Sequence, residues 1–569
     1  MRKIIFLYCL VLFLVITYPL FISTGHIFLL DYAPEINYMN ECIWIFSGLT
    51  SGMDYAWCLL NKVLPDFMYM RLVITLTFGL LMTGGYYLVK ETKNIYAILF
   101  CITLLVVNPF FYGRIMDGQV NVYLVSALFV WFVYFLKQAF QTWSVRYYIF
   151  MAVMTALMAV TSVYALYLAV FCYATFFLLY FLSSKNKKKI FVWSLIVWVL
   201  AIGTNAIWFS SSATLSNLNW RIKTSFQDTQ FFVATWHYGA PLNVALLRWY
   251  WGESQGRFIT LEQFYKHPWV SIGLMGVIWI CILFGGIALW WNKKRRVELM
   301  SMIGIWMIGY ILTLGIDPGS PFRAGVQVLY DHLPFYQGFR ESQKWSILLI
   351  ILYAYLWGYG IKELFWRMQA FRLRWLIMFF LVAIPIVATP VMLFGFMGQL
   401  KPKYFPQEYS DVRDALRGIT PTQSCENSEK SVGGCYTFLY FPWYSYIGLR
   451  WIEKTTMTHR IVSYITNPWQ SLYGDNDIIG DLWSTSIRPE SKTIERFIRR
   501  QWQRINALEM LQEMSLFDQE IRKLGIQYII VFMDERNSPR YTIFLDSMVE
   551  QKYLDIFQNN WLLRVYRVQ

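Results

Sequence analysis

Two carboxylates, Asp31 and Glu35, stand a few residues beyond the first apolar segment that is long enough to cross a membrane. A charged side chain beside hydrocarbon is energetically costly, and it is usually retained for chemistry or for binding. Residues 24–41 therefore predict a catalytic or substrate-binding site at the outer face of the membrane. A proline-containing acidic loop is also typical of a helix cap or a turn, so a structural role is the alternative.

Basic side chains gather where a late apolar segment begins. Arg323 lies in the preceding loop, and Arg340 and Lys344 are four positions apart, which is about one helical turn. Cations at a membrane surface bind lipid phosphate or pyrophosphate well, so these three side chains are predicted to bind a phosphorylated substrate. Basic side chains that only reach towards the lipid headgroups are the alternative.

A third polar group lies in the short stretch NPFFYGRIMDGQVN, residues 108–121, and contains Arg114, Asp117 and Gln119. Its density of polar residues between two spans predicts a part in substrate binding. The planar guanidinium of Arg114 suits a phosphate or a carboxylate, so it is predicted to bind phosphate or to pair with Asp31 or Asp117. A simple turn with an arginine at the headgroups is the alternative.

The long polar insert at residues 210–268 is rich in aromatic side chains and contains His237. Sugar rings pack well on Trp and Tyr, so the insert and His237 are predicted to bind substrate. A belt of aromatic side chains at the membrane interface is the alternative. The chain has 5 histidines and none at ligand spacing, so no histidine metal site is predicted.

Apolar segments must position these loops. Of the 569 residues, 57% are hydrophobic and 15% are charged, which is typical of a polytopic α-helical membrane protein. Apolar runs long enough to cross a bilayer predict about eleven transmembrane helices. They cover residues 4–24, 67–89, 95–111, 119–136, 146–161, 163–182, 190–209, 269–291, 298–315, 342–361 and 374–397.

Lysine and arginine gather in the short connections that lie inside the cell if the N-terminus is cytoplasmic. These connections account for the whole formal net charge of +15. Such an excess follows the positive-inside rule, so the basic character of the chain does not indicate nucleic-acid binding. The expected location is the plasma membrane, with a cytoplasmic N-terminus and an extracytoplasmic C-terminal domain.

The composition changes near residue 400, beyond which charges of both signs appear and no apolar span follows. We predict a transmembrane domain at residues 1–398, with outer loops at 25–66, 108–118, 210–268 and 316–341. Residues 399–569 are predicted to form a small extracytoplasmic α/β domain. The supporting patterns are a helix at 494–523 and strands at 435–443, 526–533 and 561–568.

Four local patterns resemble the GT-C superfamily of polytopic glycosyltransferases, and within it a broad group of bacterial and archaeal membrane proteins. The first is LLDYAPEIN, which contains Asp31, and the second is NPFFYGRIMDGQVN before a span. The third is LPFYQGFRESQKW at the start of a late span, and the fourth is LGIQYIIVF followed by WLLRVYRV. Together these patterns span most of the chain.

The resemblance implies a transferase that takes a sugar from a polyprenyl-phosphate donor and inverts the anomeric carbon. It implies an acidic catalytic base in the first outer loop, a position that Asp31 matches. It also implies that Arg323, Arg340 or Lys344 binds the donor phosphate. Asp31 has no adjacent carboxylate, so Glu35 is the alternative base, or a residue that orients the acceptor or a divalent metal ion.

The expected partners are the lipid-linked sugar donor, membrane lipids and an envelope glycan, lipid or protein as acceptor. The sequence has no P-loop and no Rossmann glycine pattern, and it predicts no cofactor other than that metal ion. A flippase-like transporter of envelope lipid or polysaccharide and a non-catalytic membrane scaffold are the competing classes. Polar residues in the middle of spans would favour transport, whereas here they gather at the outer ends.

Cys425 and Cys435 are the two cysteines of the C-terminal domain, and we predict a disulfide between them. A short polar loop closes easily, and an extracytoplasmic compartment is oxidising. The bond should stabilise the domain by about 2–3 kcal/mol. Mass spectrometry of protein purified without reductant should find the cross-linked peptide. Two free thiols, the alternative arrangement, would contradict the prediction.

Overall fold

The computed structural model describes residues 1–29, 63–65, 67–162, 164–184, 239–248, 268–333, 336–417, 437–441, 446–449, 507–534 and 538–569, with shorter described stretches between 187 and 261 and between 451 and 479. Asp31, Glu35, His237, Cys425 and Cys435 lie outside the described residues. The chain divides into a helical unit, Met1–Ile22 with Met39–Leu400, and a C-terminal unit, Ser23–Tyr38 with Lys401–Gln569.

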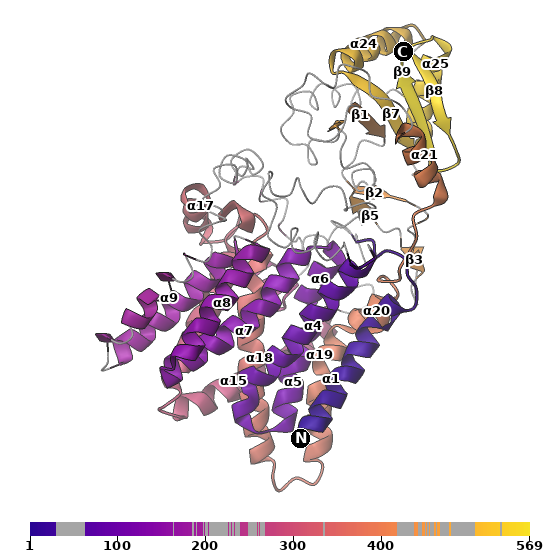
Figure 1. Cartoon of the computed structure of the whole chain (residues 1–569). Coiled ribbons are helices and arrows are strands. Elements are labelled where there is room, and N and C mark those ends of the chain that lie inside the picture. The colour runs from indigo at the N-terminus through magenta and orange to yellow at the C-terminus, as the bar shows by residue number, and fades with distance from the viewer. Residues whose placement is uncertain are drawn as a thin grey trace. The chain divides into compact units, whose positions relative to one another are not determined.

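The helical unit consists of long apolar helices that run side by side (Figure 1). They are α1 (Arg2–Thr17), α4 (Met68–Val89), α5 (Ile95–Val106), α7 (Val120–Thr142), α8 (Val145–Thr161), α9 (Ala165–Ser183), α15 (Pro268–Trp291), α16 (Arg296–Leu314), α18 (Ser346–Arg367) and α19 (Arg374–Ala388). Shorter helices are α6 (Pro109–Asp117), α12 (Ala240–Ala245), α17 (Arg323–His332) and α20 (Leu393–Met397). The 3₁₀ turns are η1 (Tyr18–Phe21), η3 (Lys90–Thr92), η5 (Tyr336–Phe339), η6 (Ser342–Trp345) and η7 (Pro390–Met392).

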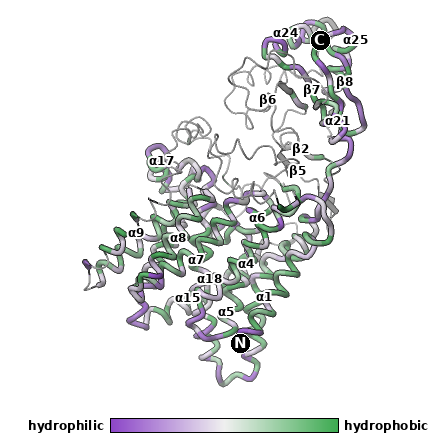
Figure 2. The backbone as a smooth tube through the Cα atoms, in the orientation of Figure 1, coloured by the Kyte–Doolittle hydropathy of each residue, from purple (hydrophilic) through white to green (hydrophobic). Residues whose placement is uncertain are grey.

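The predicted class, a polytopic helical membrane protein, is confirmed. Within the described residues, 8 helices are long and apolar enough to cross a membrane, or up to 9 if the bent pair after residue 373 is one span. Hydrophobic residues cover most of the length of these helices (Figure 2). Helix α8 is shorter, with 17 residues, and most of the predicted span 190–209 lies outside the described residues. The number of about eleven spans therefore stays a prediction.

The last predicted span, residues 374–397, is not one straight helix. It bends by 75° between Arg374–Ala388 and Pro390–Met397. Pro385 lies inside α19 and has no N–H to donate to the helix ladder. Thr389, just before Pro390, has φ −135° and ψ 58°, because a residue before proline is disfavoured in the helical region. Pro385 and Pro390 thus explain why the helix bends although the run of apolar residues continues.

Helix α18 is the centre of the helical unit, since every residue from its start to Ile361 is buried. It packs against α15, α5 and α16. Two glycines allow α15 to approach it closely: a Cβ at Gly285 would lie 1.9 Å from the Leu356 carbonyl oxygen, and one at Gly360 would lie 2.0 Å from that of Cys281. On another side, Trp357 stacks on Phe100 of α5 with ring centroids 3.9 Å apart.

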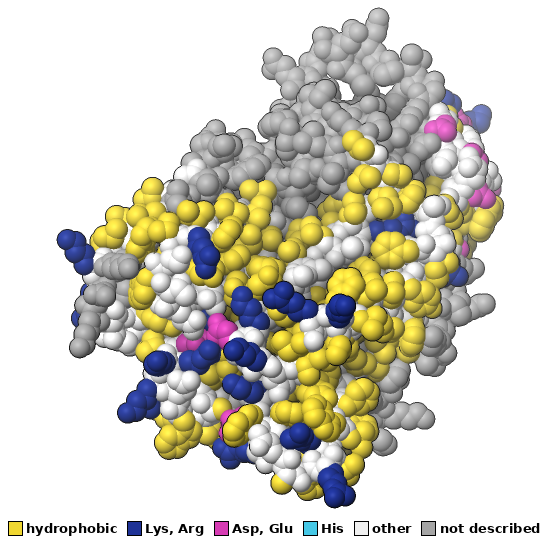
Figure 3. All heavy atoms as spheres, turned by 60° about the horizontal axis from the view of Figure 1, so that its bottom comes forward, with side chains coloured by type: hydrophobic (Ala, Val, Ile, Leu, Met, Phe, Trp, Pro, Cys, Tyr) yellow, Lys and Arg dark blue, Asp and Glu magenta, His cyan; other side chains and the backbone are white. Residues whose placement is uncertain are grey.

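Four charged side chains, Glu91, Lys137, Arg295 and Glu298, form one network near the ends of α4, α7 and α16. The Lys137 ammonium lies 3.6 Å from Glu91 and 3.4 Å from Glu298, and Arg295 lies 2.6 Å from Glu91. Tyr355 of α18 donates a hydrogen bond to Glu298. Lys137 is 0% and Glu298 is 1% exposed, so each charge depends on the others for compensation. Figure 3 shows basic side chains gathered over this end of the helical unit.

Replacing Lys137 by Met should destabilise the protein strongly, because Glu91 and Glu298 would then share one cation. Removing one partner of a buried ion pair costs about 3–5 kcal/mol. Thermal unfolding in detergent should show a clearly lower midpoint for Lys137→Met than for Lys93→Met, whose lysine is exposed directly after η3. The double variant Lys137→Met/Glu298→Gln should lose less stability than the sum of the losses in the two single variants. Strictly additive losses would contradict the network.

The C-terminal unit contains a mixed sheet in the order β6-β1-β7-β9-β8. Its strands are β1 (Thr437–Phe441), β6 (Asp477–Ile479), β7 (Ile526–Phe532), β8 (Leu554–Asn559) and β9 (Leu563–Val568). The pairs β1–β6 and β1–β7 are parallel, whereas β7–β9 and β8–β9 are antiparallel. Two short antiparallel pairs accompany it: β2 (Tyr446–Gly448) with β5 (Tyr464–Thr466), and β3 (Lys454–Thr455) with β4 (Arg460–Ile461).

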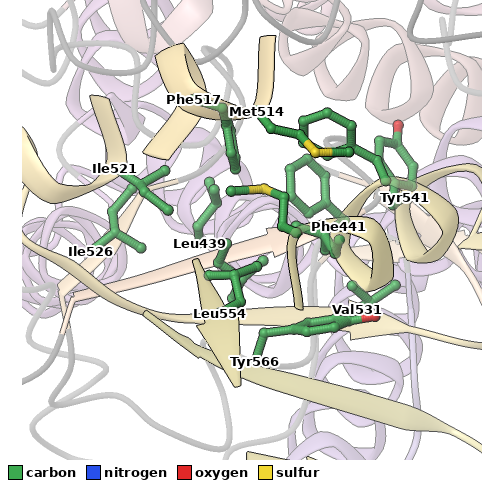
Figure 4. Packing of buried hydrophobic residues seen from close by; sticks show 14 residues of the cluster. Leu439, Phe441, Met514, Phe517, Ile521, Ile526, Val531, Tyr541, Leu554 and Tyr566 are labelled. Atoms are coloured by element: carbon green, nitrogen blue, oxygen red, sulfur yellow. The ribbon is translucent and has the colours of Figure 1, made fainter. Parts of the chain in front are cut away.

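Both faces of the central strand β7 are buried. Ile529 and Val531 of β7 belong to a core with α24 (Ala507–Lys523) and α25 (Ser538–Glu550), which Figure 4 shows from close by. Tyr528, Ile530 and Phe532 alternate with them and belong to a second core with α21 (Gln407–Arg417). From Tyr528 to Phe532, strand β7 is therefore apolar and buried, as expected of a strand covered on both faces.

Candidate functional site

The short helix α6 positions Arg114, although the sequence suggests an outer loop at residues 108–118. The Asn108 side chain accepts a hydrogen bond from the Phe111 backbone N–H at 2.9 Å, and Pro109 occupies the first helical position. Gly118 ends the helix in the left-handed region at φ 77°. This cap, proline and glycine pattern is a helix signal that the polar character of the stretch obscured.

Arg114 points into a buried cluster that joins α6 to the start of α18. Its Nη1 lies 2.5 Å from Glu341 Oε2 and donates to Gln119 Oε1 at 2.6 Å. Gln119 Nε2 donates to both carboxylate oxygens of Glu341, at 3.0 and 2.9 Å. Arg114 also donates to Gln343 Oε1 at 3.3 Å, and Asp117 lies 3.9 Å away. We refer to these five residues as the Arg114 cluster.

Most residues of the Arg114 cluster are buried, so their pairing matters for the stability of the fold as well as for the chemistry of the site. Arg114 is 1%, Asp117 0% and Glu341 4% exposed. Burial alone would raise the pKa of Glu341, but the cations Lys344, Arg114 and Arg340 and the hydrogen bond from Gln119 outweigh it and hold that pKa well below its usual range. Glu341 is therefore an ionised partner for Arg114 at neutral pH.

Sequence reasoning missed Glu341 and Gln343, although both lie in the quoted LPFYQGFRESQKW pattern. The prediction for this stretch used the cations Arg340 and Lys344 and did not consider the carboxylate that lies between them. The arginine of the NPFFYGRIMDGQVN stretch signals that a compensating group is needed if it is buried, but it does not identify Glu341 as that group. The predicted pairing of Arg114 with Asp117 occurs only at 3.9 Å, and the partner in close contact is Glu341.

The three basic residues predicted to bind phosphate have a different environment from Arg114. Lys344 donates to the Gly338 carbonyl oxygen at 2.8 Å and lies 4.9 Å from the Tyr164 ring centroid. Arg323 donates to the Ile316 carbonyl oxygen at 2.8 Å. Both side chains, like Arg340, are half-buried and keep exposed surface. These three cations therefore keep surface that an anionic group can reach, which the buried Arg114 does not.

Within the part of the chain that the structure describes, no group of three His, Cys, Asp or Glu side chains could hold a metal ion. Asp31 and Glu35 lie outside that part. A divalent metal ion at those carboxylates therefore stays a prediction.

The segment that leads to Asp31 is fixed in the C-terminal unit. His26 and Lys403 exchange two backbone hydrogen bonds, of 2.6 and 2.7 Å, and a Cβ at Gly25 would lie 2.7 Å from the Lys403 carbonyl oxygen. Phe28 is 1% exposed and packs edge-on against Phe405 and Trp451, with ring centroids 4.9 and 5.2 Å away. The backbone is thus anchored up to residue 29.

No family model and no curated protein sequence matches the chain. Among solved structures, it is similar to the oligosaccharyltransferase of Archaeoglobus fulgidus in the apo form, with a TM-score of 0.55, 11% identity, and coverage of 95% of this chain and 70% of that chain. It is also similar to ArnT of Cupriavidus metallidurans in the apo state, with a TM-score of 0.42, 11% identity, and coverage of 99% and 98%.

The similarity to the oligosaccharyltransferase is one of fold. It confirms, at that level, the resemblance to the GT-C superfamily of polytopic membrane glycosyltransferases that the four sequence patterns predict. The chain is a multi-pass membrane protein whose fold is similar to that of this oligosaccharyltransferase.

Replacing Glu341 by Gln should destabilise the protein, because Arg114 would remain buried without its close counter-ion. The loss should approach about 3–5 kcal/mol at neutral pH. Because the folded state lowers the pKa of Glu341, its stabilisation is present at neutral pH and is lost as the pH falls below the ordinary glutamate value of about 4.3. Thermal unfolding of wild type and Glu341→Gln should therefore differ at pH 7 and converge in acid.

The matched control is Glu363→Gln, which removes a surface pair with Arg367 four residues further along α18. A surface pair contributes about 0–1 kcal/mol, so this variant should unfold close to wild type. Equal unfolding midpoints for Glu341→Gln and Glu363→Gln at pH 7 would show that the Arg114 cluster is not a stabilising element.

Proposed function

We propose that this chain transfers a sugar from a polyprenyl-phosphate carrier to an envelope glycan, lipid or protein. The observation that carries the proposal is the charge arrangement before α18, where Arg340 and Lys344 keep exposed surface while Arg114 is paired with Glu341. The fold shared with an oligosaccharyltransferase supports the reaction class. A lipid-linked donor is also consistent with a sequence that has no nucleotide-binding pattern.

The proposed reaction is an inverting displacement. The acceptor atom attacks the anomeric carbon from the face opposite the phosphate, and the bond between that carbon and the phosphate oxygen breaks. The polyprenyl phosphate leaves with the bonding electrons, and nearby cations stabilise its added charge. The acceptor proton passes to a carboxylate that acts as the general base.

Arg340 and Lys344, with Arg323, are the proposed contacts to the donor phosphate. The Arg340 guanidinium can bind two phosphate oxygens at once, whereas a lysine ammonium acts as a compact charge. Arg114 and Gln119 are proposed to take part indirectly, because their contacts to Glu341 fix the chain between Arg340 and Lys344, and Asp117 lies 3.9 Å from Arg114. His237 and the aromatic residues of the insert at 210–268 are proposed to contact the sugar.

Asp31 is the proposed base, and Glu35 is the alternative. The anchoring of residues up to 29 supports this assignment, since a base must be held near the proton that it accepts. We further propose that the N-terminus lies in the cytoplasm and that the C-terminal unit lies outside. The basic residues at the N-terminal end of the helical unit support this orientation (Figure 3).

Replacing Asp31 by Asn should lower sugar transfer by about 100-fold or more, because the amide has nearly the same volume but cannot accept the proton. Donor binding should remain. The measurement is the release of free polyprenyl phosphate in proteoliposomes supplied with polyprenyl-phosphate sugars and an envelope fraction as acceptor. Asp411→Asn, the same change at an exposed position of α21, should keep wild-type activity.

The pattern among variants separates the possibilities. Normal transfer by Asp31→Asn together with loss in Glu35→Gln would identify Glu35 as the base. Full activity in both variants, or no carrier release by wild type with any donor, would contradict the proposed transferase.

A further inference from the structure

A groove of about 730 Å³ lies between α1 and α4, away from the Arg114 cluster. Its apolar lining includes Phe6, Leu10 and Phe13 of α1 and Met82 of α4. Helix α1 packs instead on α5 and α20, and Tyr8 forms a hydrogen bond with Thr103 of α5. These contacts hold α1 in place while leaving space between it and α4.

The two ends of the groove differ in their surroundings. Arg71, near the start of α4, donates from Nε to the Leu20 carbonyl oxygen at 2.6 Å and so joins α4 to η1, which follows α1. At the opposite end the lining contains Arg2 and Lys90, and among the residues that the structure describes it contains no carboxylate. The neighbouring Glu91 is held by Lys137 and Arg295, so its charge is compensated elsewhere.

The middle of the groove suits a hydrocarbon chain. A Cβ added at Gly79 would meet no atom within 4 Å, so this glycine leaves open space. The hydroxyl of Thr83, one of the polar groups of the lining on this helix, donates to the Gly79 carbonyl oxygen at 2.7 Å. Phe6 is 71% and Leu10 is 42% exposed, so apolar surface continues from the groove to the outside of α1.

We propose that this groove binds an anionic phospholipid from the leaflet at the Arg2 end, with an acyl chain between α1 and α4 and the phosphate at Arg2 and Lys90. The charge of the groove selects this occupant, because two cations at the headgroup level attract an anionic lipid and favour it over a zwitterionic one. Lys90 is held ready for this contact by a 3.0 Å hydrogen bond to the Tyr134 hydroxyl and by the Tyr87 ring, whose centroid is 4.4 Å away.

The proposed binding position of this lipid is different from that of the proposed sugar donor. The groove has its cations at the N-terminal end of α1, where the chain carries its basic connections, whereas Arg340 and Lys344 precede α18 in the loop assigned to the opposite side. Occupation of the groove would fill the space between α1 and α4 and should therefore stabilise the helical unit.

Native mass spectrometry of the full chain in detergent, titrated with dioleoylphosphatidylglycerol or dioleoylphosphatidylcholine, tests the proposal. We expect wild type to bind the anionic lipid at least about 10-fold more tightly, a difference of about 1.4 kcal/mol. The double variant Arg2→Gln/Lys90→Gln should lose this preference. Lys3→Gln/Lys93→Gln, which removes the same charge from neighbouring lysines outside the groove lining, should keep it.

A second variant tests the apolar part without changing charge. Gly79→Phe should fill the open space and reduce binding of both lipids, and its thermal unfolding should no longer respond to added anionic lipid. Equal affinity of wild type for the two lipids would overturn the proposal. So would unchanged preference in Arg2→Gln/Lys90→Gln, or displacement of the phospholipid from the groove by undecaprenyl phosphate at lower concentration, which would make the carrier lipid the occupant.

Discussion

The buried ion pair between Arg114 and Glu341 is the contact on which the arrangement before α18 depends. It joins two segments 227 residues apart and is reinforced by Gln119 and Gln343. A buried arginine and a buried carboxylate are each costly alone, so the pair is stable only if both segments take their places together. The pair therefore fixes the segment that carries Arg340 and Lys344. It also balances the charge of Arg114 within the protein.

A second set of charges, the network of Lys137, Glu298, Glu91 and Arg295, contacts α18 near its middle, where Tyr355 donates to Glu298. Helix α18 has 22 residues, a length of about 33 Å, which matches a bilayer core of about 30 Å. A polar cluster at its start, a second polar contact near its middle and burial of every residue from its start to Ile361 suit a helix that spans the membrane as a fixed axis. Such a rigid core suits a site that must hold a lipid-linked donor in one orientation.

The sequence predicted most of the features that depend on the length of apolar runs and on local residue patterns. The long helices, strands β7 and β9 and the GT-C resemblance follow from runs and motifs that can be read locally. The partner of Arg114 could not be read in this way, because Glu341 is distant in the chain and the pairing follows from packing. The helix at Pro109–Asp117 was obscured by its polar residues, and the bend near Pro390 by an uninterrupted apolar run. The roles of Asp31, Glu35 and His237 stay predictions, since these residues lie outside the described parts.

A cryo-electron microscopy structure in lipid nanodiscs with a bound polyprenyl-phosphate sugar tests the central claim most directly. The transferase account predicts density for the donor phosphate in contact with Arg340 or Lys344, while Arg114 remains paired with Glu341. A phosphate bound to Arg114 with Glu341 displaced, or a carrier lipid found only in the groove between α1 and α4, would contradict it.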